Sequence, residues 1–221
     1  MQKRKQITIF VNSFGYMLDH LYFFKKKAKQ VFDLFSEETL EKERQEELPD
    51  FQENPEKWSN ALAEKEYEQN FTKYEYTKLL ILGLYSLWER DIKNFLYNHP
   101  LLDDEKEKIN KFSFREINEL FSKNISLKES FEKIKVLSLV ANVIKHGDGI
   151  SLERLYKCPS SFFIYPSDFS DKLKDSDKLK DSAKYGFRVS EKDFFCFYDV
   201  LQNFWVNLFH LKQITLCFQG A

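Results

Sequence analysis

The sequence predicts an all-α protein, a helical bundle with two long helices and an irregular insertion before the last helix. Apolar residues recur at steps of three and four from Ile7 to Phe35, which is the spacing of one helix face. A second apolar series indicates another long helix: Trp58, Leu62, Phe71, Leu79, Leu82, Tyr85, Trp88, Ile92 and Phe95. No segment predicts a sheet with comparable clarity. A chain of 221 residues suits a single core. We therefore expect one helical domain over residues 1–221, with residues 147–190 as an irregular insertion.

The first long helix is expected to span Ile7 to Phe35, with Gly15 as its only interruption. Ser36 is a good N-cap for a second helix, which is acidic and weakly apolar. This helix should end before Pro49, because proline lacks the amide hydrogen that a helix interior needs.

A second long helix is expected to begin with Asn54 as its N-cap and Pro55 at the first helical position. Both residue types are favoured at those positions. The helix should run to about Asn98, since Pro100 disfavours helical backbone at the residue before it.

Three capping boxes predict where later helices start, because a serine three residues before an acidic residue satisfies two free amides at a helix N-terminus. The pairs are Ser113 with Glu116, Ser126 with Glu129, and Ser190 with Asp193. The second pair opens a helix from Leu127 to His146, which is apolar on nearly every side and ends at Gly147. The third pair opens the last helix, from Phe194 to about Leu211.

Cysteine usage and hydropathy exclude several classes of protein. Cys158, Cys196 and Cys217 are an odd number without a CxxC pair, which argues against a secreted disulfide framework and a zinc knuckle. The longest central uncharged run, from Leu79 to Trp88, has ten residues, about half of what a membrane span requires. We expect a cytoplasmic protein that does not cross a membrane.

Charge is distributed unevenly along the first quarter of the chain. Residues 1–30 carry seven Lys or Arg against one Asp, whereas residues 31–56 carry ten acidic residues against two basic ones. The basic block either attracts nucleic acid or forms a solvated helix face balanced by its acidic neighbour. The 23 Phe and 11 Tyr fall mostly at helical spacing, which favours core packing over base stacking.

The segment LVANVIKHGDGIS, Leu139 to Ser151, carries the main functional signal. Asn142 and His146 are four residues apart and share a helix face, with Lys145 beside it. An imidazole transfers protons at neutral pH, and an amide orients a phosphate or a water. Alternatively, these side chains supply ordinary hydrogen bonds at a helix C-terminus, where a cation is also favourable.

The segment LVANVIKHG resembles the nucleotide-binding helix of histidine-kinase-type ATPases, in which the Asn coordinates magnesium. That family also needs a later glycine-rich box, because only glycine lets the backbone approach the phosphates closely. Beyond Gly149 the only glycines are Gly186 and Gly220. We therefore expect no nucleotide cofactor and no metal.

The chain from about Tyr76 to Phe163 resembles the HEPN superfamily, small helical bundles of bacterial toxins, CRISPR-associated nucleases and phage-defence proteins. Their motif, commonly Arg-Asn-x-x-x-His, aligns with Ala141-Asn142-Val143-Ile144-Lys145-His146. The Asn and the His match, and Ala141 replaces the Arg. In many such domains an acidic residue of the preceding long helix points at the motif, and Glu89 is the candidate here.

The resemblance implies metal-independent RNA cleavage by a homodimer that brings two motif helices together. His146 would transfer protons, Asn142 would orient the substrate, Lys145 would contact phosphate and Glu89 would support the motif. Without its Arg, the motif equally fits an inactive binding or regulatory subunit that recognises a protein or nucleotide partner. A third interpretation is a helical partner-binding module that uses the basic N-terminal helix and the repeated SDKLKD loop.

Overall fold

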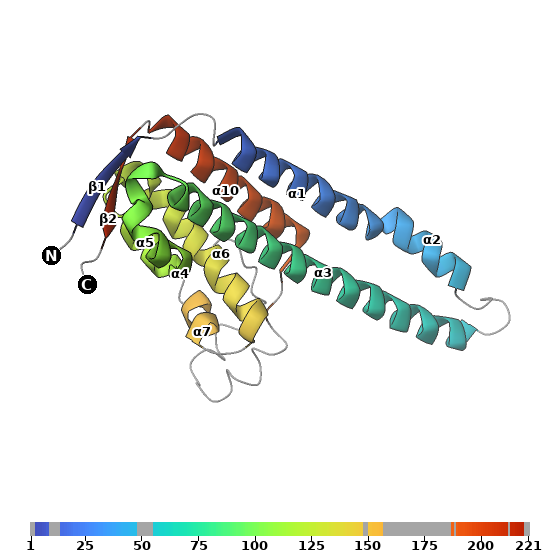
Figure 1. Cartoon of the computed structure of the whole chain (residues 1–221). Coiled ribbons are helices and arrows are strands. Elements are labelled where there is room, and N and C mark those ends of the chain that lie inside the picture. The colour runs from blue at the N-terminus through green and yellow to red at the C-terminus, as the bar shows by residue number, and fades with distance from the viewer. Residues whose placement is uncertain are drawn as a thin grey trace.

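The computed structural model describes residues 3–8, 14–47, 55–147, 150–156, 187, 189–211 and 213–218. It is an all-α helical bundle, as predicted, with a small two-stranded ribbon at one end (Figure 1). The α-helices are α1 (Phe14–Leu34), α2 (Glu37–Glu47), α3 (Pro55–Tyr97), α4 (Lys106–Lys111), α5 (Phe114–Leu120), α6 (Lys128–His146), α7 (Ile150–Tyr156) and α10 (Glu191–His210). The 3-10 helices η2 (Pro100–Glu105) and η3 (Ile125–Leu127) precede α4 and α6. The expected acidic and second long helices are thereby confirmed as α2 and α3.

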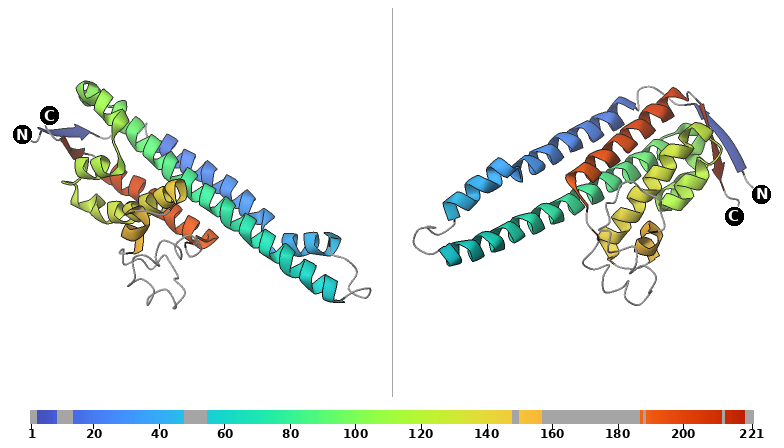
Figure 2. Two further views of the ribbon diagram at one scale, coloured as in Figure 1. Left: turned by 90° about the horizontal axis from the view of Figure 1, so that it is seen from below. Right: turned by 180° about the vertical axis from the view of Figure 1, so that it is seen from behind.

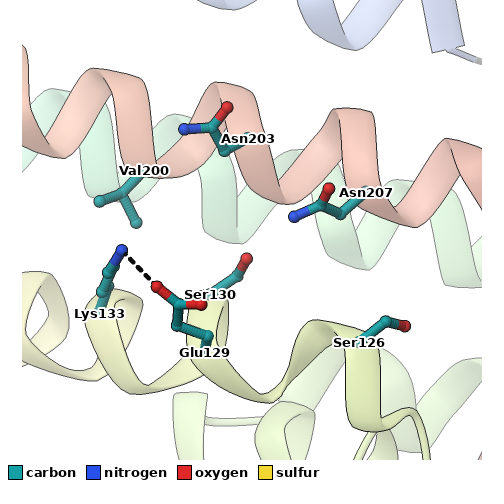
Figure 3. Close-up of a pocket in the computed structure, with 7 residues that line it drawn as sticks. All are labelled: Ser126, Glu129, Ser130, Lys133, Val200, Asn203 and Asn207. Carbon is teal, nitrogen blue, oxygen red and sulfur yellow. Dashed lines mark ion pairs between the residues drawn. The ribbon is translucent and has the colours of Figure 1, made fainter.

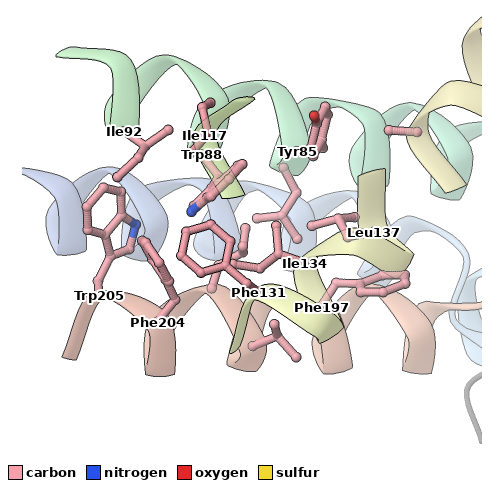
Figure 4. Close-up of a cluster of buried hydrophobic side chains, with 14 of the residues drawn as sticks. Tyr85, Trp88, Ile92, Ile117, Phe131, Ile134, Leu137, Phe197, Phe204 and Trp205 are labelled. Carbon is pink, nitrogen blue, oxygen red and sulfur yellow. The ribbon is translucent and has the colours of Figure 1, made fainter. Parts of the chain in front are cut away.

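The core of the bundle lies where α6 and α10 pack against the C-terminal half of α3 (Figure 4). Its centre is a cluster of aromatic rings in which Trp88, Phe131 and Phe204 meet edge to face. Ring centroids are 5.7 Å apart for Trp88 and Phe204, and 5.3 Å for Phe131 and Phe204. Burying one such side chain contributes about 1.5–3 kcal/mol, so this cluster fixes α3, α6 and α10 relative to one another.

Helices α1 and α2 run antiparallel to α3 and form a long hairpin with it (Figures 1 and 2). The far part of this hairpin, residues 34–47 with 55–76, projects beyond the bundle and is called the arm below. Within the arm, Arg44 Nη1 of α2 donates to Glu66 of α3 over 2.9 Å. Closer to the bundle, Gly83 lets α1 and α3 approach closely, because a Cβ there would lie 2.9 Å from the ring of Phe24.

The ribbon joins the two ends of the chain and corrects the first expected helix. Strand β1 (Lys3–Thr8) pairs antiparallel with β2 (Gln213–Phe218), and Ile7 lies opposite Ile214. Both isoleucines are buried. The helix predicted from Ile7 therefore begins only at Phe14. Residues 3–8 form a strand instead, because they pair with a strand more than 200 residues away in the sequence.

Two of the three predicted capping boxes form. Ser113 pairs with Glu116, and Ser190 with Asp193, at the starts of α5 and α10. The prediction for Ser126 is wrong, because α6 begins at Lys128 after a 3-10 turn, with Leu127 as its N-cap. The turn buries Leu127 completely, and burying a leucine is worth more than the roughly 1 kcal/mol of a cap.

The predicted insertion begins as expected at Gly147, whose φ of 71° ends α6. The expectation of irregular structure is wrong for residues 150–156, which form α7. Leu152 and Leu155 of α7 are buried against the bundle, and α7 packs on α6. The SDKLKD repeat lies outside the described residues.

Candidate functional site at the end of α6

Helix α6 carries a row of polar side chains along its boundary with α3. Ser138, Asn142 and Lys145 are spaced by four and three residues and therefore share one face. Ser138 is buried, Asn142 is half-buried and Lys145 is exposed. This row, called the polar stripe, leads from the core to the surface, and Lys145 stands at its exposed end. The sequence predicted a shared face for Asn142 and His146, with Lys145 beside it.

Tyr85 of α3 links the buried and exposed parts of the polar stripe. Its hydroxyl is hydrogen-bonded to Ser138, and Lys145 Nζ lies 5.8 Å from the centroid of its ring. Burial raises the pKa of Tyr85 to about 12; the Ser138 hydrogen bond acts in the opposite direction, and the charge of Glu89 adds to the rise. At neutral pH the phenol is therefore uncharged, and it supports Lys145 through its ring face.

Glu89 does not lie beside His146. Its carboxylate is paired with Lys93 of the same helix over 3.0 Å. Contacts of Tyr85 with Ser138 and of Trp88 with Phe131 show that α3 and α6 run antiparallel. Glu89 and His146 thus extend from the Tyr85–Ser138 contact in opposite directions, by four and eight residues, which separates them by roughly 18 Å along the helices.

Ala141 stands where the HEPN motif has its arginine, and its side chain is 0% exposed. The neighbouring Val140 is also fully buried, so this part of α6 faces the core. An arginine at this position would place its charge inside the bundle, where an unpaired charge is strongly unfavourable. An arginine at position 141 could therefore not place its guanidinium at the surface without a change in the packing of α6.

His146 is exposed in the last turn of α6, next to Lys145. Among the described residues no hydrogen bond or ion pair joins it to Asn142, Lys145 or Glu89. The imidazole is accessible to a ligand from solution, but no neighbouring side chain in the described part of the chain orients it.

A second polar cluster, between α1 and α3, was not predicted from the sequence. His20 Nδ1 donates to Asp91 Oδ2 over 3.0 Å, while Arg90 donates to Asp91 Oδ1 through Nη2 and Nε over 3.0 and 3.1 Å. Asp91 is only 2% exposed, so the Arg90 guanidinium and the ring N–H of His20 compensate a buried carboxylate. The sequence did show that Asp91 is an acidic residue on the apolar face of a long helix, which indicates a buried partner. It did not identify that partner, because His20 is 71 positions away.

A cavity of about 170 Å³ lies between α6 and α10, away from the polar stripe (Figure 3). It is lined by Ser126, Glu129, Ser130, Lys133, Val200, Asn203 and Asn207. Its two charged side chains, Glu129 and Lys133, neutralise each other in an ion pair of 2.8 Å. The remaining groups are hydroxyls, amides and one valine, so the cavity presents no nucleophile with an adjacent base.

In the described part of the chain, no group of three or more His, Cys, Asp or Glu side chains is arranged to hold a metal ion. Over the same residues, none of the helices combines the length and apolar character that a membrane crossing needs. No family model, curated protein or solved structure matches the chain.

Proposed function

We propose that the protein is a HEPN-like RNA-binding protein that does not cleave its ligand, acting in the toxin or phage-defence setting that the resemblance implies. The proposed absence of cleavage is supported mainly by the burial of Ala141, which stands at the arginine position of the motif. Losing a charge clamp of this kind typically costs about a hundredfold or more in rate. The pairing of Glu89 with Lys93 and its distance from His146 also count against an assembled catalytic site.

Binding is supported by the side chains that remain at the surface. Lys145 supplies a positive charge held over Tyr85, and His146 supplies a ring nitrogen in the same turn. Asn142, half-buried on the same face, supplies an amide donor. A lysine contacts phosphate as a point charge without the two-pronged geometry of arginine, which suits binding of the RNA backbone better than transition-state stabilisation.

The test measures RNA binding and RNA cleavage on the same preparations. Labelled single-stranded RNA is titrated with wild type, Lys145→Ala and His146→Ala, and the RNA is then run on a denaturing gel. Lys145→Ala should weaken binding and lower the slope of log K against log salt by about one, because one fewer counterion is released. Lys135→Ala, on an exposed part of the same helix, is the matched control and should bind like wild type.

Fragmentation of the RNA by wild type but not by His146→Ala would establish an endoribonuclease and refute the proposed loss of activity. Wild type and His146→Ala should also be expressed inducibly in bacteria, with growth and RNA integrity measured in parallel. This experiment tests for RNA cleavage in the cell. Salt-independent or absent RNA binding would contradict the proposal and favour a subunit that recognises a protein.

A further inference from the structure

His20 of α1 and Asp91 of α3 form a dyad in which a buried carboxylate holds a partly accessible imidazole. The side chain of Asp91 is 2% exposed and that of His20 is 23% exposed. His20 Nδ1 lies 3.0 Å from Asp91 Oδ2. The two helices that carry the dyad run side by side (Figure 1). One nitrogen of the ring is therefore held from inside the molecule, while the ring itself remains in contact with solvent.

The neighbours of Nδ1 determine which ring nitrogen of His20 carries the proton. An ionised Asp91 only accepts hydrogen bonds, so the contact of 3.0 Å requires a proton on Nδ1. Arg90 Nη2 lies 3.3 Å from the same nitrogen but is only a donor, so it cannot take this proton as an acceptor. The neutral imidazole of His20 therefore carries its free electron pair on Nε2.

Nε2 of His20 is free to react. In the described part of the chain it has no hydrogen-bond partner, and it is not one of the side-chain atoms that are buried without a partner. Solvent therefore reaches Nε2. A carboxylate on Nδ1 makes such a ring a better nucleophile, because it fixes the orientation of the ring and stabilises the imidazolium cation that forms when Nε2 attacks.

Arg90 supplies hydrogen-bond donors beside the imidazole. Its side chain is 56% exposed, and its Nε and Nη2 donate to Asp91 Oδ1 over 3.1 and 3.0 Å. These bonds fix the guanidinium and leave Nη1 without a partner in the described residues. Guanidinium N–H groups match the oxygens of a phosphoryl group. Attack by Nε2 also adds a positive charge to the ring, which favours an anionic substrate.

We propose that His20 is a phosphoryl-acceptor histidine, modified on Nε2 by a small phosphoryl donor such as an acyl phosphate or phosphoramidate. The electron pair of Nε2 forms the new nitrogen–phosphorus bond while the bond between phosphorus and the leaving group breaks. The leaving group takes the electrons of that bond and departs as a carboxylate from an acyl phosphate, or as ammonia from the protonated amine of phosphoramidate. The Nδ1 proton stays hydrogen-bonded to Asp91, and Arg90 Nη1 donates to the phosphoryl oxygens.

This modification goes beyond the proposed RNA binding and does not depend on it. Asp91 follows Tyr85 by six residues on α3, so the two side chains point about 120 degrees apart around the helix. The dyad and the polar stripe therefore lie on different sides of α3. RNA binding by the unmodified protein enters none of the outcomes below, so either proposal can fail without the other.

The chain contains its own control histidines. His146 and His210 are both exposed, whereas His20 is half-buried. Within the described residues, neither of the exposed imidazoles has a carboxylate on a ring nitrogen. If accessibility alone decided reactivity, both would react faster than His20, so the dyad predicts the opposite order.

The test incubates the full chain with phosphoramidate at neutral pH and follows each histidine by peptide mass spectrometry. His20 should be phosphorylated at least about tenfold faster than His146 or His210. The product should be lost in acid and kept in alkali, which distinguishes a nitrogen–phosphorus bond from a phosphate ester. Asp91→Asn should lower the rate at His20 to that at His146, because an amide can hold the tautomer with the proton on Nε2.

Arg90→Gln tests the preference for a phosphoryl group. The amide of Gln can still donate to Asp91 but lacks the guanidinium. This variant should lose at least about tenfold in the rate of phosphorylation, and less than about twofold in the rate at which the uncharged reagent diethyl pyrocarbonate acylates His20. Circular dichroism of both variants checks that the helices are retained.

Equal phosphorylation of the three histidines in wild type would overturn the proposal, and this comparison needs no variant. Asp91→Asn phosphorylated as fast as wild type would also overturn it. Rapid acylation of His20 in wild type without rapid phosphorylation would identify a reactive histidine that is not a phosphoryl acceptor. Equal losses of acylation and phosphorylation in Arg90→Gln would contradict the role given to the guanidinium.

Discussion

Single residues at the end of α6 differ in chemical role according to how deeply they are buried. Lys145 and His146 are exposed to solvent, whereas Ala141 and the neighbouring Tyr85 of α3 are buried. Tyr85 keeps its proton because ionising it would place a charge in a dry environment. Ala141 is the smallest side chain with a Cβ, and its burial leaves α6 close to its neighbours.

The raised pKa of Tyr85 predicts a loss of stability in alkali. The unfolded tyrosine ionises near pH 10 and the folded one near pH 12, so its stabilising contribution is complete below pH 10 and disappears as pH rises toward 12. The loss from this group should reach about 2–3 kcal/mol. Urea denaturation at pH 8, 10 and 11.5 should show this extra loss in wild type and not in Tyr85→Phe.

The same series on Tyr67→Phe separates this effect from general alkaline denaturation, because Tyr67 is exposed on the arm. Equal pH profiles for wild type and Tyr85→Phe would mean that the phenol is solvated in the folded protein. At pH 8 the Tyr85→Phe variant should lose only about 1 kcal/mol, for the hydrogen bond to Ser138.

Restoring the arginine of the HEPN motif should damage the fold rather than create an enzyme. Ala141→Arg buries an unpaired charge and overfills the core, and should lower the free energy of unfolding by at least about 3 kcal/mol. Lys145→Arg, a larger side chain on an exposed position of the same helix, should change it by less than about 0.5 kcal/mol. Urea denaturation followed by circular dichroism measures both.

An Ala141→Arg variant as stable as wild type would show that α6 can expose this side chain. Such a variant should then be assayed for RNA cleavage, since the guanidinium would have reached the surface. Cleavage by that variant and not by wild type would identify the missing arginine as the sole defect of the site.

At the scale of helices and strands, local sequence patterns predicted most helix ends correctly. Pro55 begins α3 as expected, Gly147 ends α6, and two capping boxes form, because each depends only on neighbouring residues. The two wrong predictions, for strand β1 and for the start of α6, concern segments whose structure is decided by contacts with distant parts of the chain. Strand β1 needs β2, and the start of α6 is decided by burial of Leu127, which a cap pattern does not report.

At the candidate site, too, the features set by local spacing were predictable, whereas those set by packing between helices were not. Helical spacing predicted a shared face for Asn142 and His146, with Lys145 beside it, and this prediction needs only the period of a helix. The separation of Glu89 from His146 follows from the direction and register in which α3 and α6 pack, which no pattern within either helix contains. The cluster of His20 with Asp91 was missed for the same reason.

Helix α3 should unfold locally from its arm end. Between Pro55 and Thr77 its only buried side chain is Gln69, whereas the part from Thr77 onward packs into the core. Amides of residues 58–70 should therefore exchange with deuterium at least about a hundredfold faster than those of residues 81–96. Hydrogen exchange read by mass spectrometry resolves the two segments.

Uniform protection along α3 would contradict this expectation. It would mean that the helix opens as one unit, with the arm as firmly held as the core. The ion pair of Arg44 with Glu66, which joins α2 to α3 in the arm, lies at the surface, where such pairs usually contribute less than about 1 kcal/mol.

The whole molecule combines a compact bundle with a projecting hairpin, and α3 belongs to both. Its side toward α6 supports the polar stripe through Tyr85, and its side toward α1 carries Leu79. One helix thus holds the polar stripe and the exposed Leu79 side chain on different sides.

The ribbon of β1 and β2 has a consequence for the order of folding. It pairs Lys3 with Phe218, almost the whole length of the chain apart, so closing it carries a large entropic cost until the helices have brought the ends together. During synthesis the first strand leaves the ribosome long before its partner exists. Its Lys3, Arg4 and Lys5 are charges of the kind that discourage an unpaired strand from joining another chain while it waits.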